Sequence, residues 1–142
     1  MKYNLLIVIE NGIACAYELN YKSAWTIGRS YGDNIPDIKL KTKTISRMHS
    51  SLRNIDDIWF YYDHNSKNGT TYNGERIKKG YKGRYIPKEL KDGDMLILGG
   101  NGSNDINSMT VAMVYKEELS DNEEITIGNH TYKIDGIKVM GE

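Results

Sequence analysis

The fold is decided by residues 63–77, which read DHNSKNGTTYNGERI. Inside this stretch, Asn73-Gly74 separates two short segments of strand-like composition, 70–72 and 75–77. An Asn-Gly pair between two such segments is the strongest two-residue hairpin signal, because both residues tolerate the positive φ of a tight turn. The polar residues before Thr70 read as a loop, so the stretch predicts a loop that leads into a hairpin.

The same pattern of short strands and tight turns extends over the first 115 residues, where helical periodicity is weak. Asn11-Gly12 and Asp56-Asp57 are two further predicted hairpin turns. The predicted strands are Tyr3–Glu10, Ala14–Leu19, Ala24–Ile27, Ile38–Leu40, His49–Ile55, Ile58–Asp63, Thr70–Tyr72, Glu75–Ile77, Tyr85–Leu90, Met95–Leu98 and Met109–Tyr115. About eleven short strands predict an all-β sandwich.

Charge is unevenly spread along the 142 residues, although the formal net charge is +0. Residues 20–91 hold 15 Lys/Arg against 7 Asp/Glu, whereas residues 92–142 hold 3 against 10. The middle of the chain therefore predicts a cationic field suited to an anionic ligand.

Several classes of site are not expected from this sequence. Cys15 is the single cysteine, which excludes an internal disulfide and a cysteine-based zinc site. The N-terminal apolar run, Leu5–Ile9, is shorter than a signal peptide core or a membrane helix requires. We therefore expect a cytoplasmic protein with no membrane segment, no metal and no cofactor.

The last 26 residues differ in composition from the rest. Residues 117–124 are acidic and polar, and three possible strands follow them at Ile125–Ile127, Thr131–Ile134 and Ile137–Met140. The tripeptide at 26–28 recurs at 126–128, either by coincidence or because a second, truncated copy of the domain begins there. We predict a domain at 1–116 and an acidic linker with a short β extension at 117–142.

Three polar clusters lie at strand ends, and loops at one end of a sandwich converge in space. Arg29 offers a planar fork of donors matched to phosphate, Ser46 offers a hydroxyl, and the Asn68 amide suits a peptide backbone. Four further cations lie nearby in the sequence: Lys41, Lys43, Arg47 and Lys67. Such a set of groups is suited to hold a phosphorylated side chain.

The ordered motifs Gly28-Arg29, Ser46-Arg47-x-His49, Asn68-Gly69-Thr70 and Asn73-Gly74 resemble those of the forkhead-associated (FHA) domain. The later residues 92–99, DGDMLILG, also fit, and the resemblance spans residues 3–115. It implies an FHA-type β-sandwich of about eleven strands, with ligand loops at one end that bind phosphothreonine peptides.

The resemblance also implies a role for each matching residue. Arg29 and Ser46 would bind the phosphate together with Arg47, and Asn68 would hydrogen-bond the peptide main chain. Lys43 and Lys67 are predicted peptide contacts, and Lys41 with Lys43 would favour an acidic residue about three places after the phosphothreonine. The predicted architectural residues of the loops are Gly28, His49, Gly69, Thr70, Asn73 and Gly74.

Parts of the sequence also suggest three functions other than phosphothreonine binding. An enzyme built on Ser46 and His49 is not expected, because positions three apart on a strand point to opposite faces and no orienting acid is evident. A nucleic-acid binder is less favoured, although aromatic and basic residues interleave at 81–85. A phosphate-independent interaction module of a larger bacterial protein, such as a secretion ATPase, stays open, although Arg29, Ser46 and Asn68 argue against it. We expect a phosphothreonine protein partner in Ser/Thr kinase-linked signalling or assembly, and no small-molecule substrate.

Overall fold

The computed structural model describes residues 3–100, 105–118, 124–127 and 129–138. Nearly all regular structure in these residues is β-strand, with one 3-10 turn, η1 (Leu19–Tyr21). The strands are β1 (Leu5–Glu10), β2 (Ile13–Glu18), β3 (Ala24–Arg29), β4 (Ile38–Leu40), β5 (Ser50–Ile55), β6 (Ile58–Asp63), β7 (Thr70–Tyr72), β8 (Glu75–Arg76), β9 (Pro87–Glu89), β10 (Met95–Gly99), β11 (Thr110–Lys116), β12 (Glu124–Ile127) and β13 (His130–Lys138).

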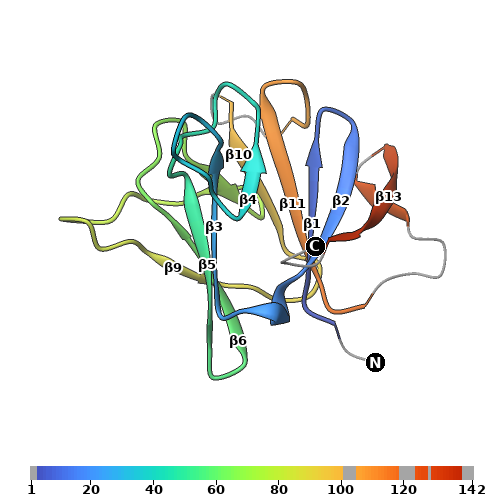
Figure 1. The fold of residues 1–142 in the computed structure, drawn as a ribbon, viewed down its shortest axis with the longest axis horizontal. Coiled ribbons are helices and arrows are strands. Elements are labelled where there is room, and N and C mark those ends of the chain that lie inside the picture. The colour runs from blue at the N-terminus through green and yellow to red at the C-terminus, as the bar shows by residue number, and fades with distance from the viewer. Residues whose placement is uncertain (1–2, 101–104, 119–123, 128, 139–142) are drawn as a thin grey trace.

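The strands form two sheets that face each other in a sandwich (Figure 1). One sheet has the order β12-β13-β2-β1-β11-β10-β7-β8, and the other has the order β4-β3-β5-β6-β9. The all-β sandwich predicted from the sequence is therefore confirmed, with eleven strands between Leu5 and Lys116.

The three predicted hairpin turns are confirmed by their backbone angles. Both central residues of each turn have positive φ, for example +52° at Asn11 and +80° at Gly12. Asp56 and Asp57 have φ of +52° and +66°, so this turn forms without a glycine. Such turns match the right-handed twist of the flanking strands, which explains why β1–β2, β5–β6 and β7–β8 are tight hairpins.

The main core lies between the two sheets. Trp25 and Leu52 from one sheet and Leu98 and Met113 from the other are at most 1% exposed. Burial of each such side chain stabilises the fold by about 1.5–3 kcal/mol relative to an exposed position. The loops at the strand ends are therefore built on a rigid support.

A second apolar cluster lies on the outer face of the larger sheet. Ile7, Ala14 and Val114 belong to it, together with Ile134 of β13, and Ile125 of β12 packs against it. Strand β13 pairs in parallel with β2, and β2 in turn is the neighbour of β1. Both faces of β1 are thus covered, which explains why its first five residues form an unbroken apolar run.

The C-terminal segment differs in part from the sequence prediction. The two strands expected at 131–134 and 137–140 are one strand, β13, with an irregular register between Ile134 and Ile137. Residues 139–140 and Gly128 lie outside the described residues. The predicted domain boundary after residue 116 stays a prediction.

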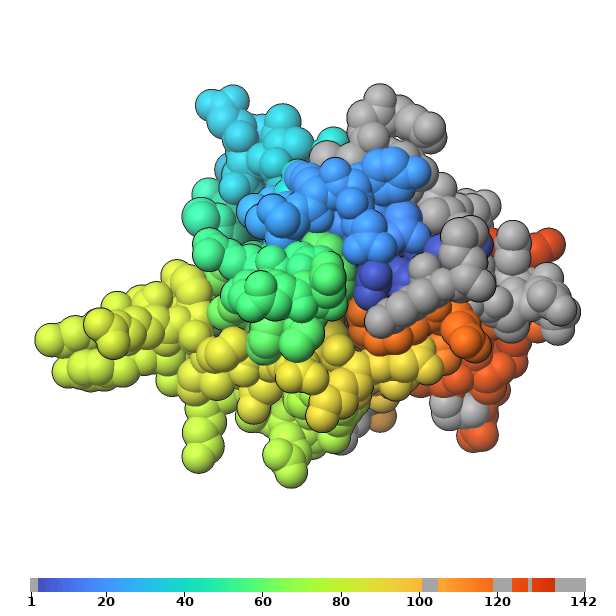
Figure 2. Space-filling view, turned by 90° about the horizontal axis from the view of Figure 1, so that it is seen from below, coloured from blue at the N-terminus to red at the C-terminus, as the bar shows by residue number. Residues whose placement is uncertain are grey.

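One segment projects from the body of the sandwich. Residues 77–86 run between β8 and β9, and the tip of this connection extends away from both sheets (Figures 1 and 2). Its ends are anchored, because Ile77 packs against the core and the Tyr85 ring stacks on His64. In the described part of the chain, no helix is both long and apolar enough to cross a membrane.

Candidate functional site

The end of β3 is in direct contact with the β4–β5 loop, residues 41–49. The backbone N–H of Arg29 donates to the Ser46 carbonyl at 3.0 Å, and its Nε donates to the Ile45 carbonyl at 3.0 Å. Gly28 is buried, and a Cβ at this position would collide with the Arg47 carbonyl oxygen. Arg29 is therefore held by backbone contacts that require a glycine before it.

The guanidinium of Arg29 keeps donors for a ligand. An arginine has five N–H donors, and only the one on Nε is used here. No acceptor among the residues that the structure describes bonds the Nη atoms of Arg29, and no carboxylate there pairs with Arg29 or Arg47. The two arginines therefore present unneutralised positive charge.

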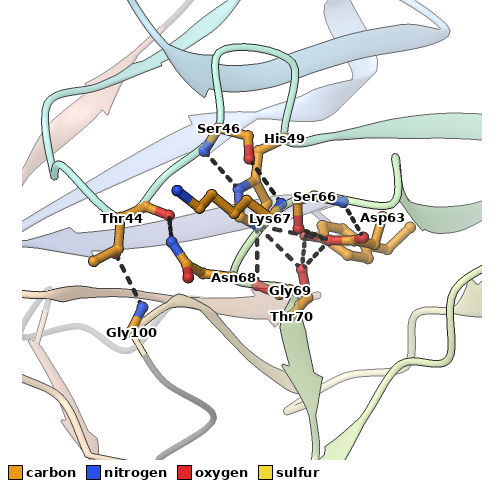
Figure 3. Close-up of polar contacts among 11 residues, drawn as sticks. Thr44, Ser46, His49, Asp63, Ser66, Lys67, Asn68, Gly69, Thr70 and Gly100 are labelled. Atoms are coloured by element: carbon orange, nitrogen blue, oxygen red, sulfur yellow. Dashed lines mark hydrogen bonds and ion pairs between the residues drawn. The ribbon is translucent and has the colours of Figure 1, made fainter.

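His49 joins the β4–β5 loop to the β6–β7 loop, residues 64–69 (Figure 3). Its Nδ1 accepts from the Ser46 backbone N–H at 3.1 Å, so the proton must be on Nε2, which donates to the Gly69 carbonyl at 3.1 Å. The ring is 0% exposed, and burial lowers its pKa, although nearby Asp63 acts in the opposite direction. His49 is thus a neutral structural bridge.

Asp63 organises the start of the β6–β7 loop. Its carboxylate accepts from the Ser66 N–H at 2.9 Å, from the Ser66 hydroxyl at 2.6 Å and from the Thr70 hydroxyl at 2.8 Å. Because Thr70 donates to Asp63, it accepts from the Tyr61 hydroxyl at 2.8 Å. The carboxylate is only 6% exposed, so these bonds fix the loop from inside the protein.

The β6–β7 loop is in turn tied to the β4–β5 loop. The backbone N–H of Lys67 donates to Ser46 Oγ at 3.1 Å, and Asn68 Nδ2 donates to the Thr44 carbonyl at 2.8 Å (Figure 3). Ser46 can still donate its hydroxyl proton, and the Asn68 side-chain oxygen is a further acceptor. Arg29, Ser46 and Asn68 are therefore brought to one end of the sandwich, as the sequence predicted.

Two residues missed by the sequence analysis position the arginines. The guanidinium of Arg47 stacks 3.8 Å above the Tyr31 ring, and that of Arg29 lies 5.9 Å from the same ring. The Asn34 side chain donates to the carbonyls of Arg29 and Arg47 at 3.1 and 2.9 Å. Nothing in the sequence around Asn34 signals these two contacts, which join it to residues 5 and 13 positions away.

Thr44 is a third missed residue. Its hydroxyl donates to the Met109 carbonyl at 2.5 Å and accepts from the Gly100 N–H at 3.0 Å. Thr44 thereby links the β4–β5 loop to residues on either side of the β10–β11 connection. In the sequence, its position two residues before Ser46 indicated that Thr44 lies near the candidate site.

The other predicted site residues differ in their placement. Lys43 and Lys67 are exposed, and the Lys67 side chain extends across the space between Ser46 and Asn68 (Figure 3). Gly69 lies inside the cluster with a φ of +73°. Asn73 and Gly74 do not join it, because Asn73 bonds Asp94 and Met95 at the opposite end of β7.

The arrangement suits anion binding rather than catalysis. His49 accepts from the backbone N–H of Ser46 and not from its hydroxyl, so the pair lacks the contact of a nucleophile with its base. In the described residues, no three His, Cys, Asp or Glu side chains are grouped to hold a metal ion. The site instead combines two arginines, a hydroxyl and an amide, which are the donors that phosphate and a peptide backbone require.

Comparison with known proteins is consistent with this geometry. The profile of the FHA domain matches residues 25–99, which is more than half of the chain. No curated protein sequence matches the chain.

Several solved structures share the fold. Full-length yeast Pml1p is 27% identical with a TM-score of 0.61, and the alignment covers 81% of each chain. The FHA domain of CT664 from Chlamydia trachomatis is 21% identical with a TM-score of 0.61, over 82% of this chain and 99% of that one. The N-terminal FHA domain of S. cerevisiae Rad53p, in complex with a phosphothreonine peptide, is 20% identical with a TM-score of 0.59, over 80% and 94%.

Proposed function

The chain belongs to the FHA domain family, whose members are interaction modules rather than enzymes, and from this premise we propose that it binds phosphothreonine peptides of a protein partner. Solved FHA structures with the same fold include the Rad53p complex and one studied for phosphothreonine-dependent interactions. The partner would be a substrate of a Ser/Thr kinase, in signalling or assembly.

The preorganised site is the observation that supports the proposal: the β4–β5 and β6–β7 loops are already joined by hydrogen bonds, while the Nη donors of Arg29, the hydroxyl proton of Ser46 and the side-chain oxygen of Asn68 stay available. His49 bridges Ser46 and Gly69, and the Lys67 N–H donates to Ser46 Oγ, so these two loops are ordered before a ligand arrives. A preorganised site avoids the entropy cost of ordering loops on binding. Arg29 and Arg47 meanwhile offer charge that no carboxylate in the described residues neutralises.

Each residue has a defined part in the proposed complex. Arg29 contacts the phosphate with its Nη donors, Ser46 adds its hydroxyl, and Arg47 contributes charge at the rim. Asn68 accepts a hydrogen bond from the peptide main chain through its side-chain oxygen, while its Nδ2 keeps the bond to Thr44. Lys43 and Lys67 contact flanking parts of the peptide.

The proposal is tested by fluorescence anisotropy with a degenerate phosphothreonine peptide library and with phosphoserine and unphosphorylated counterparts. We expect binding that requires the phosphate and is about 10-fold or more weaker for phosphoserine, since one methyl group in an apolar pocket contributes about 1–3 kcal/mol. Arg29→Ala is expected to weaken binding by at least about 2 kcal/mol, the scale of a charge-assisted hydrogen bond.

Arg84→Ala is the matched control, because this arginine lies in the exposed projecting segment. Equal binding by wild type and Arg29→Ala would reject the assigned site. Binding that does not need the phosphate would favour a phosphate-independent module, and a steep salt dependence on DNA without phosphopeptide binding would favour a nucleic-acid binder.

A further inference from the structure

A second concave surface adjoins the candidate site, at the open edge of the sandwich between β4 and the β1–β2 hairpin. This edge groove has a volume of about 580 Å³. Val8 and Leu40 lie at its base, Cys15 lines it, and Ile13 and Met109 are 58% and 47% exposed along it. A volume of roughly 300–1,000 Å³ with an apolar lining is typical of a binding site.

The rim of the edge groove is cationic. Lys39, Lys41 and Lys43 line it, and all three are exposed. Among the residues described by the structure, no carboxylate forms an ion pair with any of these lysines. Unpaired cations around an apolar floor are complementary to a segment that carries both acidic and apolar side chains.

The nearest acidic group of the groove is already engaged. The Glu10 carboxylate accepts from the backbone N–H of Lys41 at 2.8 Å, from the N–H of Thr42 at 2.9 Å and from the Thr42 hydroxyl at 2.7 Å. Glu10 thus fixes the start of the β4–β5 loop. Glu10 keeps its charge, so the described lining residues carry three positive charges and one negative charge.

The edge groove begins where the phosphopeptide site ends. Lys43 is adjacent to Thr44, whose carbonyl is bonded by Asn68 and whose hydroxyl is bonded to the Met109 carbonyl. A peptide held by Asn68 therefore lies at the mouth of the groove. Lys43 and Met109, which adjoin these bonds, both line the groove.

We propose that the edge groove is a second binding site, which takes an acidic segment with apolar side chains from the same phosphorylated partner. This inference rests on the proposed phosphopeptide function and adds the chemistry of the partner chain. The two contacts act together because the first one raises the effective concentration of the second.

The first test compares phosphothreonine peptides of different length by fluorescence anisotropy. The short peptide has three residues on either side of the phosphothreonine, and the long peptides add six alternating Glu and Leu residues beyond these, on either the N- or the C-terminal side. We expect one long peptide to bind at least about 10-fold more tightly, and the gain to fall when Glu is replaced by Gln, when Leu is replaced by Ser, or at high salt. Equal affinity of the short and both long peptides would overturn the proposal.

A second readout reports the location directly. Cys15 is the only cysteine of the chain and lines the groove, so the rate of its reaction with a neutral thiol reagent reports access to that surface. We expect the tighter long peptide to slow this reaction and the short peptide to leave it unchanged. An unchanged rate with the long peptide bound would overturn the groove as its location.

Matched substitutions separate the effect of the groove from that of general charge. Lys39→Gln changes a groove lysine that has no part in the proposed phosphopeptide site, and it is expected to remove part of the gain from the extension and to leave the short peptide unaffected. Lys78→Gln, at an exposed position between β8 and β9, removes the same charge elsewhere and is expected to change the affinity of neither peptide. If the short phosphopeptide fails to bind wild type, the proposed function is rejected; if it binds and Lys39→Gln has no effect on the gain from the extension, only the groove is rejected.

Discussion

At each end of the short strand β7, a carboxylate accepts several hydrogen bonds from the neighbouring turn. The two ends differ in whether the nearby cations are paired with carboxylates. At one end Asp63 accepts three hydrogen bonds from Ser66 and Thr70, and at the other Asp94 accepts three from Tyr72, Asn73 and Lys91. Both carboxylates thus fix a turn. A dense hydrogen-bond network in a loop is therefore not by itself a sign of a binding site.

The cations distinguish the two ends. Near Asp94, Lys116 lies 3.7 Å from the Asp92 carboxylate, so positive charge there has an acidic neighbour. Near Asp63, the guanidinium groups of Arg29 and Arg47 face the Tyr31 ring instead of a carboxylate. Near Asp94, Lys88 also faces a ring, that of Tyr72, at 5.7 Å. The Asp63 end thus differs in holding two guanidinium groups that no carboxylate in the described residues pairs with.

The largest expected difference between the ends is in stability. Asp63→Ala would leave two buried hydroxyls and the Ser66 N–H without their acceptor, and we expect it to lower the free energy of unfolding by about 3 kcal/mol. Asp94→Ala changes a half-buried group and is expected to cost about 1 kcal/mol. Urea denaturation measures both values, and equal losses would show that burial does not distinguish the two networks.

The second expected difference appears in acid. Burial lowers the pKa of His49 and of His64, so the unfolded chain takes up protons that the folded protein does not when the pH falls below about 6.5. Stability is therefore lost as the pH falls, by at most about 1.4 kcal/mol per pH unit for the buried His49 and by less for the partly solvated His64.

Urea denaturation of the ligand-free protein between pH 7.5 and 5.5 measures this dependence. We expect the slope to decrease in His49→Gln, and His64→Gln isolates the contribution of the second ring. A slope that both substitutions leave unchanged would contradict a neutral, buried His49 bridge.

The smallest expected effect concerns Tyr31. Loss of its ring in Tyr31→Ala frees Arg47 to adopt other orientations, and we expect phosphopeptide affinity to fall by about 0.5–1 kcal/mol, the scale of an exposed cation–π contact. Tyr31→Phe keeps the ring and should bind like wild type. Tyr81→Ala removes a ring that also faces a lysine, Lys82, in the projecting segment, and serves as the control. A loss as large in Tyr81→Ala would remove the distinction between these rings.

Local sequence rules predicted much of the fold because its turns are short. The three hairpin turns depend on positive φ at two adjacent residues, which Asn, Asp and Gly tolerate. The strands Ile38–Leu40, Ile58–Asp63 and Thr70–Tyr72 were predicted with the bounds that the structure has. The strand expected at 85–90 is shorter in the structure, Pro87–Glu89.

The candidate site was predicted less completely, for a physical reason. Motif order identified Arg29, Ser46 and Asn68, which the structure brings together. It also grouped Asn73-Gly74 with them, although three residues of β7 carry this turn to the opposite end. A sequence motif groups residues that are close along the chain. A strand is extended, with a rise of about 3.3 Å per residue, so residues before and after it lie at opposite ends of the sheet.

By itself, the sequence determined the all-β class, the hairpin turns, and a cationic middle region that carries ordered motifs like those of the FHA domain. The tertiary structure decided which charges stay unpaired, because salt bridges and cation–π contacts join residues that only sheet pairing brings together. It also decided that Tyr31 supports two arginines, that Thr44 reaches Met109, and that β13 covers the outer face of β1 and β2. Turns follow from the φ preferences of two or three adjacent residues, but a binding surface depends on side chains from distant strands and loops.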